Sequence, residues 1–188
     1  MITAHIDFKS LDCFLAINPI LDLAADCGTQ VNWRPYRSKA RALPTQVVNK
    51  TVTHTHHRVR AESERRVQQH YAELRGLEID PNRGQVDTSD ALGWLANLEG
   101  DTSLFVSRLF SAHWIDHADI NDPKFLEQLT DEFGLIRTQD TVDLASIELE
   151  AEAQGLFDAP TFFIEGHMFV GRAHIPLMRQ LLTGTDCH

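Results

Sequence analysis

Residues 155–171, GLFDAPTFFIEGHMFVG, contain two short runs of aromatic and β-branched residues separated by a turn signal. The runs at 161–164 and 168–170 flank Glu165-Gly166-His167, in which glycine supplies the positive φ that a tight turn needs. Pro160 stands immediately before the first run, and proline is tolerated at the beginning of a strand but poorly inside it. The stretch therefore predicts a β-hairpin preceded by proline.

The beginning of the chain predicts a strand, a helix and a second strand. Residues 2–8 alternate as a short strand does, and from Ser10 apolar residues recur at steps of three and four until Gly28. Residues 30–33 indicate the second strand, so the opening is a βαβ unit with a parallel strand pair. Pro19 lies within the helical run and is expected to kink it.

Helices are predicted on both sides of the hairpin, at about 143–154 and 175–182. The order βαβ, then αββα, is that of an α/β protein with the thioredoxin fold. Between the two halves, helix caps and glycine stops replace strand signals, which indicates an inserted helical domain. We predict a thioredoxin-like domain over 1–34 and 143–188, and a helical domain over 35–142.

Within the insert, helices are expected at 61–75, 89–99, 101–117 and 123–133. The stretch 37–57 is polar and weakly periodic, and we expect a loop with one short helix.

Composition narrows the function. The 188 residues carry a net charge of -10, which repels nucleic acid and anionic lipid at long range. No apolar run approaches the ~20 residues that a membrane span needs. The three cysteines form neither a disulfide framework nor a four-ligand metal set. We therefore expect a cytoplasmic protein that acts on a small molecule, without a nucleic-acid or membrane partner.

Two segments are candidates for chemistry. Ser10 stands at the predicted start of the first helix, where unpaired N–H groups and the helix dipole favour an anion such as a thiolate. The alternative is that Ser10 only caps the helix. The second segment is Ala159-Pro160, where a cis peptide bond would turn a backbone face toward a ligand.

Taken together, these segments resemble a family. Residues 7–16, DFKSLDCFLA, are similar to the "DF-x-SPYSYLA" start of 2-hydroxychromene-2-carboxylate isomerases and kappa-class glutathione transferases. Residues 155–171 resemble that family's "G-x-x-GVPTFVVDGEMFWG" segment, and 110–114 and 118–123 resemble its "F-x-A-x-W" and "DI-x-DP" motifs. These proteins belong to the DsbA-like branch of the thioredoxin superfamily.

The resemblance implies a glutathione-dependent isomerase or transferase that forms a homodimer. Ser10 would hold the glutathione sulfur, and Ala159 with Pro160 would offer backbone to the cysteinyl unit. Arg172 with Ala173 occupies the position that grips the γ-glutamyl end. In the family's isomerase chemistry, the thiolate adds to a conjugated substrate, a bond rotates and the sulfur leaves.

Three departures from the family pattern bear on the site. Leu11 replaces the usual proline, Cys13 a small or hydroxyl residue, and Ala173 the acid that would pair with the γ-glutamyl ammonium. Arg172 is open to a carboxylate of glutathione or of another acidic ligand. Two alternatives stay open: a DsbA-like thiol-disulfide oxidoreductase using Cys13, and a catalytically silent binding protein.

Two groups of histidines could in principle supply metal ligands. His113 and His117 fall at i and i+4 of a predicted helix, and three more lie within residues 54–57. No acidic residue has the spacing of a zinc protease, so we expect no metal site.

Overall fold

The computed structural model describes residues 1–38, 52–138 and 142–184, and the chain divides into two compact units. The core unit comprises Met1–Ser38 and Asp80–His188, and the inserted unit comprises Lys39–Ile79. All the predicted site residues belong to the core unit. Residues 80–142, which the sequence assigned to the helical domain, lie in the same compact unit as the sheet. The predicted domain boundaries themselves stay a prediction.

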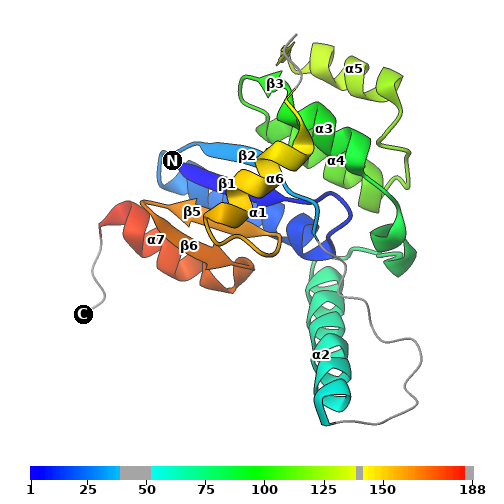
Figure 1. The fold of residues 1–188 in the computed structure, drawn as a ribbon, viewed down its shortest axis with the longest axis vertical. Helices are drawn as coiled ribbons and strands as arrows, with labels where there is room; N and C mark the ends of the chain where they lie inside the picture. The colour runs from blue at the N-terminus through cyan, green and yellow to red at the C-terminus, as the bar shows by residue number, and fades with distance from the viewer. Residues whose placement is uncertain (39–51, 139–141, 185–188) are drawn as a thin grey trace. The chain divides into compact units, whose positions relative to one another are not determined.

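Four strands form a mixed sheet in the order β2-β1-β5-β6 (Figure 1). β1 (Ile2–Ile6) pairs in parallel with β2 (Val31–Pro35) and antiparallel with β5 (Thr161–Ile164), which pairs antiparallel with β6 (His167–Val170). Residues of β1 are buried on both faces of the sheet, as expected for a central strand. The predicted βαβ and hairpin units are thus confirmed.

The helix α1 (Leu11–Asp26) connects β1 to β2. Its apolar residues at three- and four-residue steps face the core, and Ser10 caps its first turn. Cys27 is its C-cap, and Gly28 follows with a φ of +60°, which glycine adopts without steric cost. Pro19 lies inside the helix without ending it.

The turn between β5 and β6 is tighter than predicted. Glu165 and Gly166 have φ values of 50° and 82°, so both turn residues are left-handed, and Ile164 pairs directly with His167. This is the pattern of a type I′ hairpin, whose twist matches that of the strands. β6 therefore begins at His167, one residue earlier than expected.

Helices cover the sheet. Figure 1 shows α6 (Leu144–Ala153) crossing the near face of the sheet, where it contacts β2. α7 (Ile175–Thr183) contacts α1 and β5. The helices predicted at about 143–154 and 175–182 are confirmed.

The other helices of the core unit are η1 (Pro81–Gln85), α3 (Ser89–Ala96), α4 (Ser103–Trp114) and α5 (Pro123–Glu132). α3 and α4 pack on β2, and α4 also packs on α1. Asp122 caps α5 by accepting a hydrogen bond from the Lys124 N–H, as its sequence predicted.

One expectation for this region was wrong. Two short strands, β3 (Leu98–Glu99) and β4 (Ile136–Arg137), pair antiparallel where the sequence showed no strand signal. Asn97 supports them, because its carbonyl accepts from the Thr138 N–H and its side-chain oxygen accepts from the Val142 N–H. Two residues are too few for a periodicity of two to be recognised.

The inserted unit contains α2 (Val52–Leu74). The prediction of a loop with one short helix at 37–57 is therefore wrong for residues 52–57, because these residues, with histidines at 54, 56 and 57, belong to a 23-residue helix. Residues 39–51 lie outside the described part of the chain. No helix within the described residues is long and apolar enough to cross a membrane.

Candidate functional site

Four chain segments meet at one edge of the sheet. β1 and β2 run in parallel and end at this edge, β5 begins there, and β6 ends there. Ser10 follows β1, Ser38 follows β2, Ala159-Pro160 precedes β5, and Arg172 follows β6. The topology thus gathers the site residues predicted from the two ends of the sequence.

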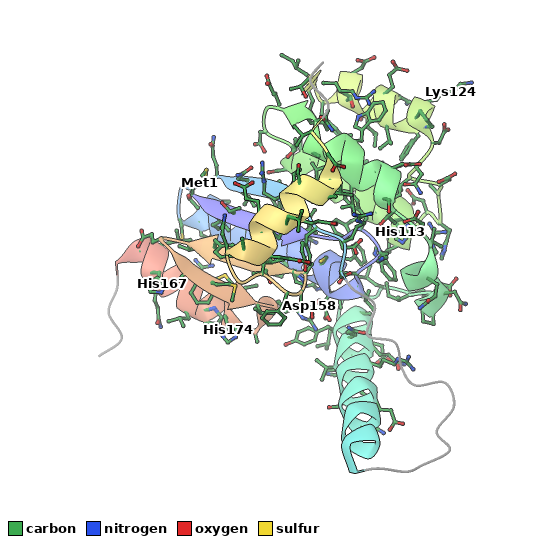
Figure 2. The ribbon with its side chains drawn as sticks, viewed as in Figure 1. Met1, His113, Lys124, Asp158, His167 and His174 are labelled. Carbon is green, nitrogen blue, oxygen red and sulfur yellow. The ribbon has the colours of Figure 1, made fainter. Side chains whose placement is uncertain are left out.

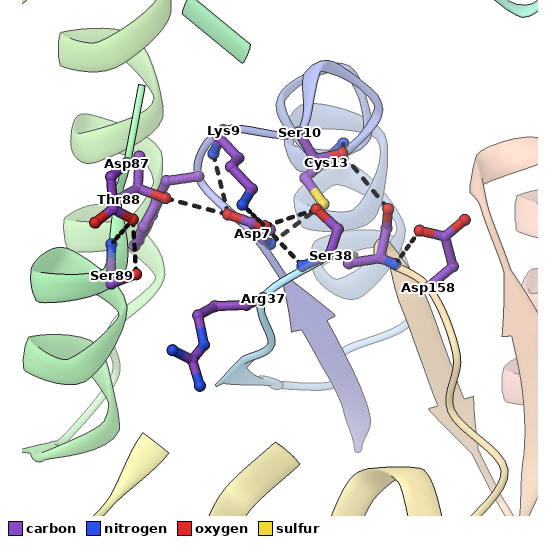
Figure 3. Close-up of polar contacts among 12 residues, drawn as sticks. Asp7, Lys9, Ser10, Cys13, Arg37, Ser38, Asp87, Thr88, Ser89 and Asp158 are labelled. Carbon is purple, nitrogen blue, oxygen red and sulfur yellow. Dashed lines mark hydrogen bonds and ion pairs between the residues drawn. The ribbon is translucent and has the colours of Figure 1, made fainter. Parts of the chain in front are cut away.

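Ser10 is the N-cap of α1. Its φ and ψ of -83° and 116° are extended, and its Oγ accepts a hydrogen bond from the Cys13 N–H at 3.3 Å. The same hydroxyl donates to the carbonyl oxygen of Ala159 at 3.5 Å, the outer limit for such a bond. The predicted capping role is confirmed, and the half-buried hydroxyl also reaches the proline segment (Figure 3).

The Ala159–Pro160 peptide bond is cis, as the sequence predicted. The segment is tied to its surroundings on both sides. The Thr161 hydroxyl donates to the Asp158 carbonyl at 2.6 Å, and the Gly171 N–H donates to the Pro160 carbonyl at 2.7 Å. The second bond joins the segment to the end of β6, where η2 (Arg172–His174) begins. Arg172 is half-buried and Ala173 is exposed.

Cys13 lies one turn inside α1 and is fully buried. Burial raises the pKa of its thiol well above the ordinary value, while the Ser10 side chain and the Asp7 backbone N–H lower it and offset this effect only in part. The Asp7 N–H donates to Sγ at 3.4 Å. Cys13 is therefore a protonated, shielded thiol at neutral pH, whereas a reactive cysteine needs an exposed thiolate.

The buried carboxylate of Asp7 supports the loop before Ser10. One oxygen accepts from the Lys9 N–H and the Thr88 hydroxyl, each at 3.2 Å. The other accepts from the Ser38 N–H at 2.7 Å and the Ser38 hydroxyl at 2.6 Å (Figure 3). A fully buried carboxylate is stable only when its oxygens are satisfied in this way. Asp7 thus joins the Ser10 loop to the end of β2 and to the start of α3.

Trp114 of α4 also contacts the loop before Ser10. Its indole Nε1 donates to the Phe8 carbonyl at 2.9 Å in a buried setting, and its ring stacks on Phe14. A β-carbon added to Gly84 of η1 would lie 3.5 Å from the Lys9 carbonyl, so this part of η1 also lies against the loop. The loop is therefore fixed by helical elements far away in the sequence.

An ion pair closes the end of β2 against α6. Arg37 donates from Nη2 and Nε to the two carboxylate oxygens of Glu148, each at 2.7 Å, and its backbone N–H adds a third bond at 2.9 Å. Such a bidentate pair is more rigid than a single contact. It fixes the chain just before Ser38.

His113, which lies in α4 (Figure 2), is hydrogen-bonded at both ring nitrogens. Arg83 donates from Nη2 to Nδ1 of the ring at 3.0 Å, which leaves Nε2 to donate to the Arg83 carbonyl at 3.0 Å. Burial, and secondarily the Arg83 charge, lowers the pKa of His113 to about 4, so the ring is neutral. Among the described residues, no group of three His, Cys, Asp or Glu side chains is placed to hold a metal ion.

Sequence reasoning missed three supporting residues. Asp7 stood in the recognised motif but was given no role, and Ser38 and Thr88 carried no signal because they reach Asp7 only through the fold. Asp158 was also missed, although it stands where the family motif has glycine. Its Oδ1 accepts from the Ala159 N–H at 2.9 Å, beside Ser10 (Figure 3).

Comparisons with known proteins agree with this architecture. Neither a protein-family model nor a curated protein matches the amino-acid sequence. A solved 2-hydroxychromene-2-carboxylate isomerase superposes with a TM-score of 0.62 at 15% identity, covering 97% of this chain and 94% of that one. The cytosolic disulfide reductase DsbM from Pseudomonas aeruginosa, solved with GSH (glutathione), gives 0.56 at 19% identity and 97% of each chain. The chain therefore shares its fold with these proteins, and this is the thioredoxin fold that its sequence predicted.

Proposed function

We propose that this protein is a glutathione-dependent isomerase or transferase in which the Ser10 hydroxyl holds the glutathione sulfur. One observation carries the proposal. Ser10 begins a 16-residue helix and faces the backbone of Ala159, while the neighbouring thiol of Cys13 is fully buried and protonated. This helix start therefore offers a hydroxyl to a thiol ligand, and in the proposed reaction the ligand would supply the sulfur.

The residues present fit a thiol ligand. The Ser10 hydroxyl already accepts from the Cys13 N–H, so its proton remains the group it can offer. The hydroxyl donates that proton to the Ala159 carbonyl in a long bond, with 3.5 Å between the two oxygens. A thiolate is charged and is therefore a stronger acceptor than this distant carbonyl. When bound, glutathione would supply a nucleophilic sulfur for attack on a conjugated substrate.

The role of the protein's own residues is electrostatic. A hydrogen bond to a charged group contributes about 1.5–3 kcal/mol, which corresponds to about one to two pKa units. Ser10, helped by the positive end of the α1 dipole, would bring a thiol of pKa ~8.5 to about 7. Asp7 and Trp114 hold the loop that aims the hydroxyl, and they do so from outside the reacting atoms.

The disulfide oxidoreductase alternative depends on Cys13. Its sulfur is inaccessible, and burial keeps the pKa of the thiol high, so attack on an external disulfide is disfavoured. The geometry supports the Ser10 assignment better.

The thiolate itself provides the test. Ultraviolet absorbance of the bound glutathione thiolate, followed against pH, should show a thiol pKa below that of free glutathione. Ser10→Thr, which keeps a hydroxyl, should preserve most of the shift, and Ser10→Ala should remove most of it, leaving the smaller part that comes from the helix dipole. A bound thiol with the pKa of free glutathione in the unaltered protein would overturn the assignment.

The proposal includes a homodimer, which the family resemblance implies. Sedimentation equilibrium at micromolar concentration should give twice the mass of the 21.3 kDa chain. A single-chain mass would remove this part of the proposal and leave the assignment of Ser10 unaffected.

A further inference from the structure

The Asp158 carboxylate accepts a hydrogen bond from a backbone N–H that lies next to Ser10. Its carboxylate accepts from the N–H of the following residue, Ala159, whose carbonyl accepts from the Ser10 hydroxyl. We propose that Asp158 is an affinity- and specificity-determining residue, because its carboxylate competes with the ligand for the Ala159 N–H. The inference rests on the proposed function, since it requires a thiol ligand held by Ser10.

Within the described residues, neither backbone group of Ala159 is hydrogen-bonded to a strand of the sheet. The Asp158 carbonyl is held by the Thr161 hydroxyl, and the Pro160 carbonyl by the Gly171 N–H. The hydrogen bonds of the Ala159 backbone go instead to two side chains, Asp158 on its N–H and Ser10 on its carbonyl. Side-chain partners can rotate away without disturbing the sheet. A ligand whose sulfur reaches Ser10 therefore finds one backbone donor and one backbone acceptor beside it.

The Asp158 carboxylate weakens the binding of any ligand that takes the Ala159 N–H. Ala159 is buried, so its N–H needs an acceptor, and Asp158 supplies one with a charge-assisted bond. A ligand carbonyl that takes this N–H must first displace the carboxylate, which remains attached one residue away. Its negative charge then lies near the ligand, and glutathione carries two carboxylates of its own. Asp158 thus lowers affinity for acidic thiols by competition and by charge.

Two substitutions at the position separate these effects. Asp158→Ala removes both the acceptor and the charge, whereas Asp158→Asn removes the charge and keeps an oxygen that can accept from Ala159. Asp12→Asn is the matched control, because Asp12 lies in the first turn of α1, near Ser10 in the sequence. It changes the net charge near the site while leaving the Asp158 contact in place.

Calorimetric titration with reduced glutathione gives the primary measurement. We expect Asp158→Ala to bind glutathione about tenfold more tightly than the unaltered protein does. This is the effect expected from removing one competing hydrogen bond to a charged group. Asp158→Asn should fall between the two, and Asp12→Asn should shift affinity less than either. Equal or weaker binding by Asp158→Ala, or an equal gain in Asp12→Asn, overturns the inference while leaving the proposed function standing. Absence of binding by all four proteins at millimolar glutathione overturns the proposed function, and the inference with it.

Amide hydrogen exchange provides a readout that needs no ligand. The Ala159 N–H should exchange slowly in the unaltered protein and at least several-fold faster in Asp158→Ala. Saturating glutathione should slow that exchange again in the variant. An exchange rate unchanged by Asp158→Ala would show that the carboxylate does not occupy the N–H, and would overturn the inference.

Discussion

The Ser10 hydroxyl lies 3.5 Å from the carbonyl oxygen of Ala159, 149 residues further along the chain. This contact joins the start of α1 to the segment before β5, and it places both at the edge where four strand ends meet. Because it is a long bond between a cap and a carbonyl, it can be exchanged for a ligand contact at small cost.

The buried state of Cys13 predicts a chemically silent thiol. Under native conditions Cys13 should resist alkylation by iodoacetamide, since burial raises the pKa of its thiol and shields its sulfur. Cys27, which is half-buried at the other end of α1, serves as the internal control and should react faster. Peptide mass spectrometry after timed labelling checks both. Faster labelling at Cys13 would revive the oxidoreductase alternative.

Removing the Cys13 sulfur should cost stability and spare binding. Cys13→Ala leaves a small cavity, so we expect a loss of about 1 kcal/mol in the free energy of unfolding. Glutathione affinity should stay within about twofold, and the unaltered protein should not catalyse insulin reduction by dithiothreitol. Strong insulin reductase activity that Cys13→Ala abolishes would contradict the assignment of Ser10.

The buried Asp7 should contribute more to the free energy of unfolding than an exposed aspartate does. Asp7→Asn places an amide where two oxygens accept from Ser38, Thr88 and Lys9, so at least one buried donor loses its acceptor. We expect a loss of about 2–4 kcal/mol in the free energy of unfolding, measured by urea denaturation. Asp116→Asn, which breaks an exposed pair with Arg108, is the control and should cost at most about 1 kcal/mol. Equal losses in the two variants would remove the supporting role of Asp7.

Two buried histidines, His5 and His113, should make the protein less stable as the pH falls. Burial lowers the pKa of His5 to about 4, with a smaller effect of the Arg34 charge, and burial also lowers that of His113 to about 4. In the unfolded chain both titrate near 6.5, so below that pH the unfolded state binds protons that the native state excludes. The free energy of unfolding should therefore fall between about pH 6.5 and 4, by up to about 1.4 kcal/mol per pH unit for each histidine.

His5 allows a controlled test of that slope. Its ring lies edge-on against Phe163, and its buried Nδ1 has no hydrogen-bond partner among the described residues, so His5→Phe should remove its share of the acid sensitivity. His70→Phe alters an exposed residue of α2 and should leave the slope unchanged. Urea denaturation at pH 7 and pH 5 measures both variants. A slope that His5→Phe leaves unaltered would contradict the burial of a neutral His5 ring.

The parts of the fold set by local signals could be predicted from the sequence. The Ser10 cap, the proline before β5 and the glycine in the hairpin turn each act within a few residues of themselves. Their order along the chain was enough to indicate the thioredoxin fold. The start of α2 was missed because its first turns are polar and carry no apolar periodicity.

The support around the site could not be predicted, because it depends on contacts distant in the sequence. Thr88 reaches Asp7 across 81 residues, and the Trp114 indole reaches Phe8 across 106. Neither pairing leaves a pattern in a single sequence. Asp158 differs, since a carboxylate at a position where the family has glycine was visible, but its contact with Ala159 needed the backbone geometry.

The most direct test of the account is a calorimetric titration of reduced glutathione into the unaltered protein and into Ser10→Ala. Asp122→Ala, which removes the equivalent cap of α5 away from the site, controls for the loss of about 0.5–2 kcal/mol that a missing cap causes. The account predicts binding by the unaltered protein and by Asp122→Ala, and an affinity at least tenfold weaker in Ser10→Ala. No binding at millimolar glutathione, or equal binding by Ser10→Ala, would contradict it.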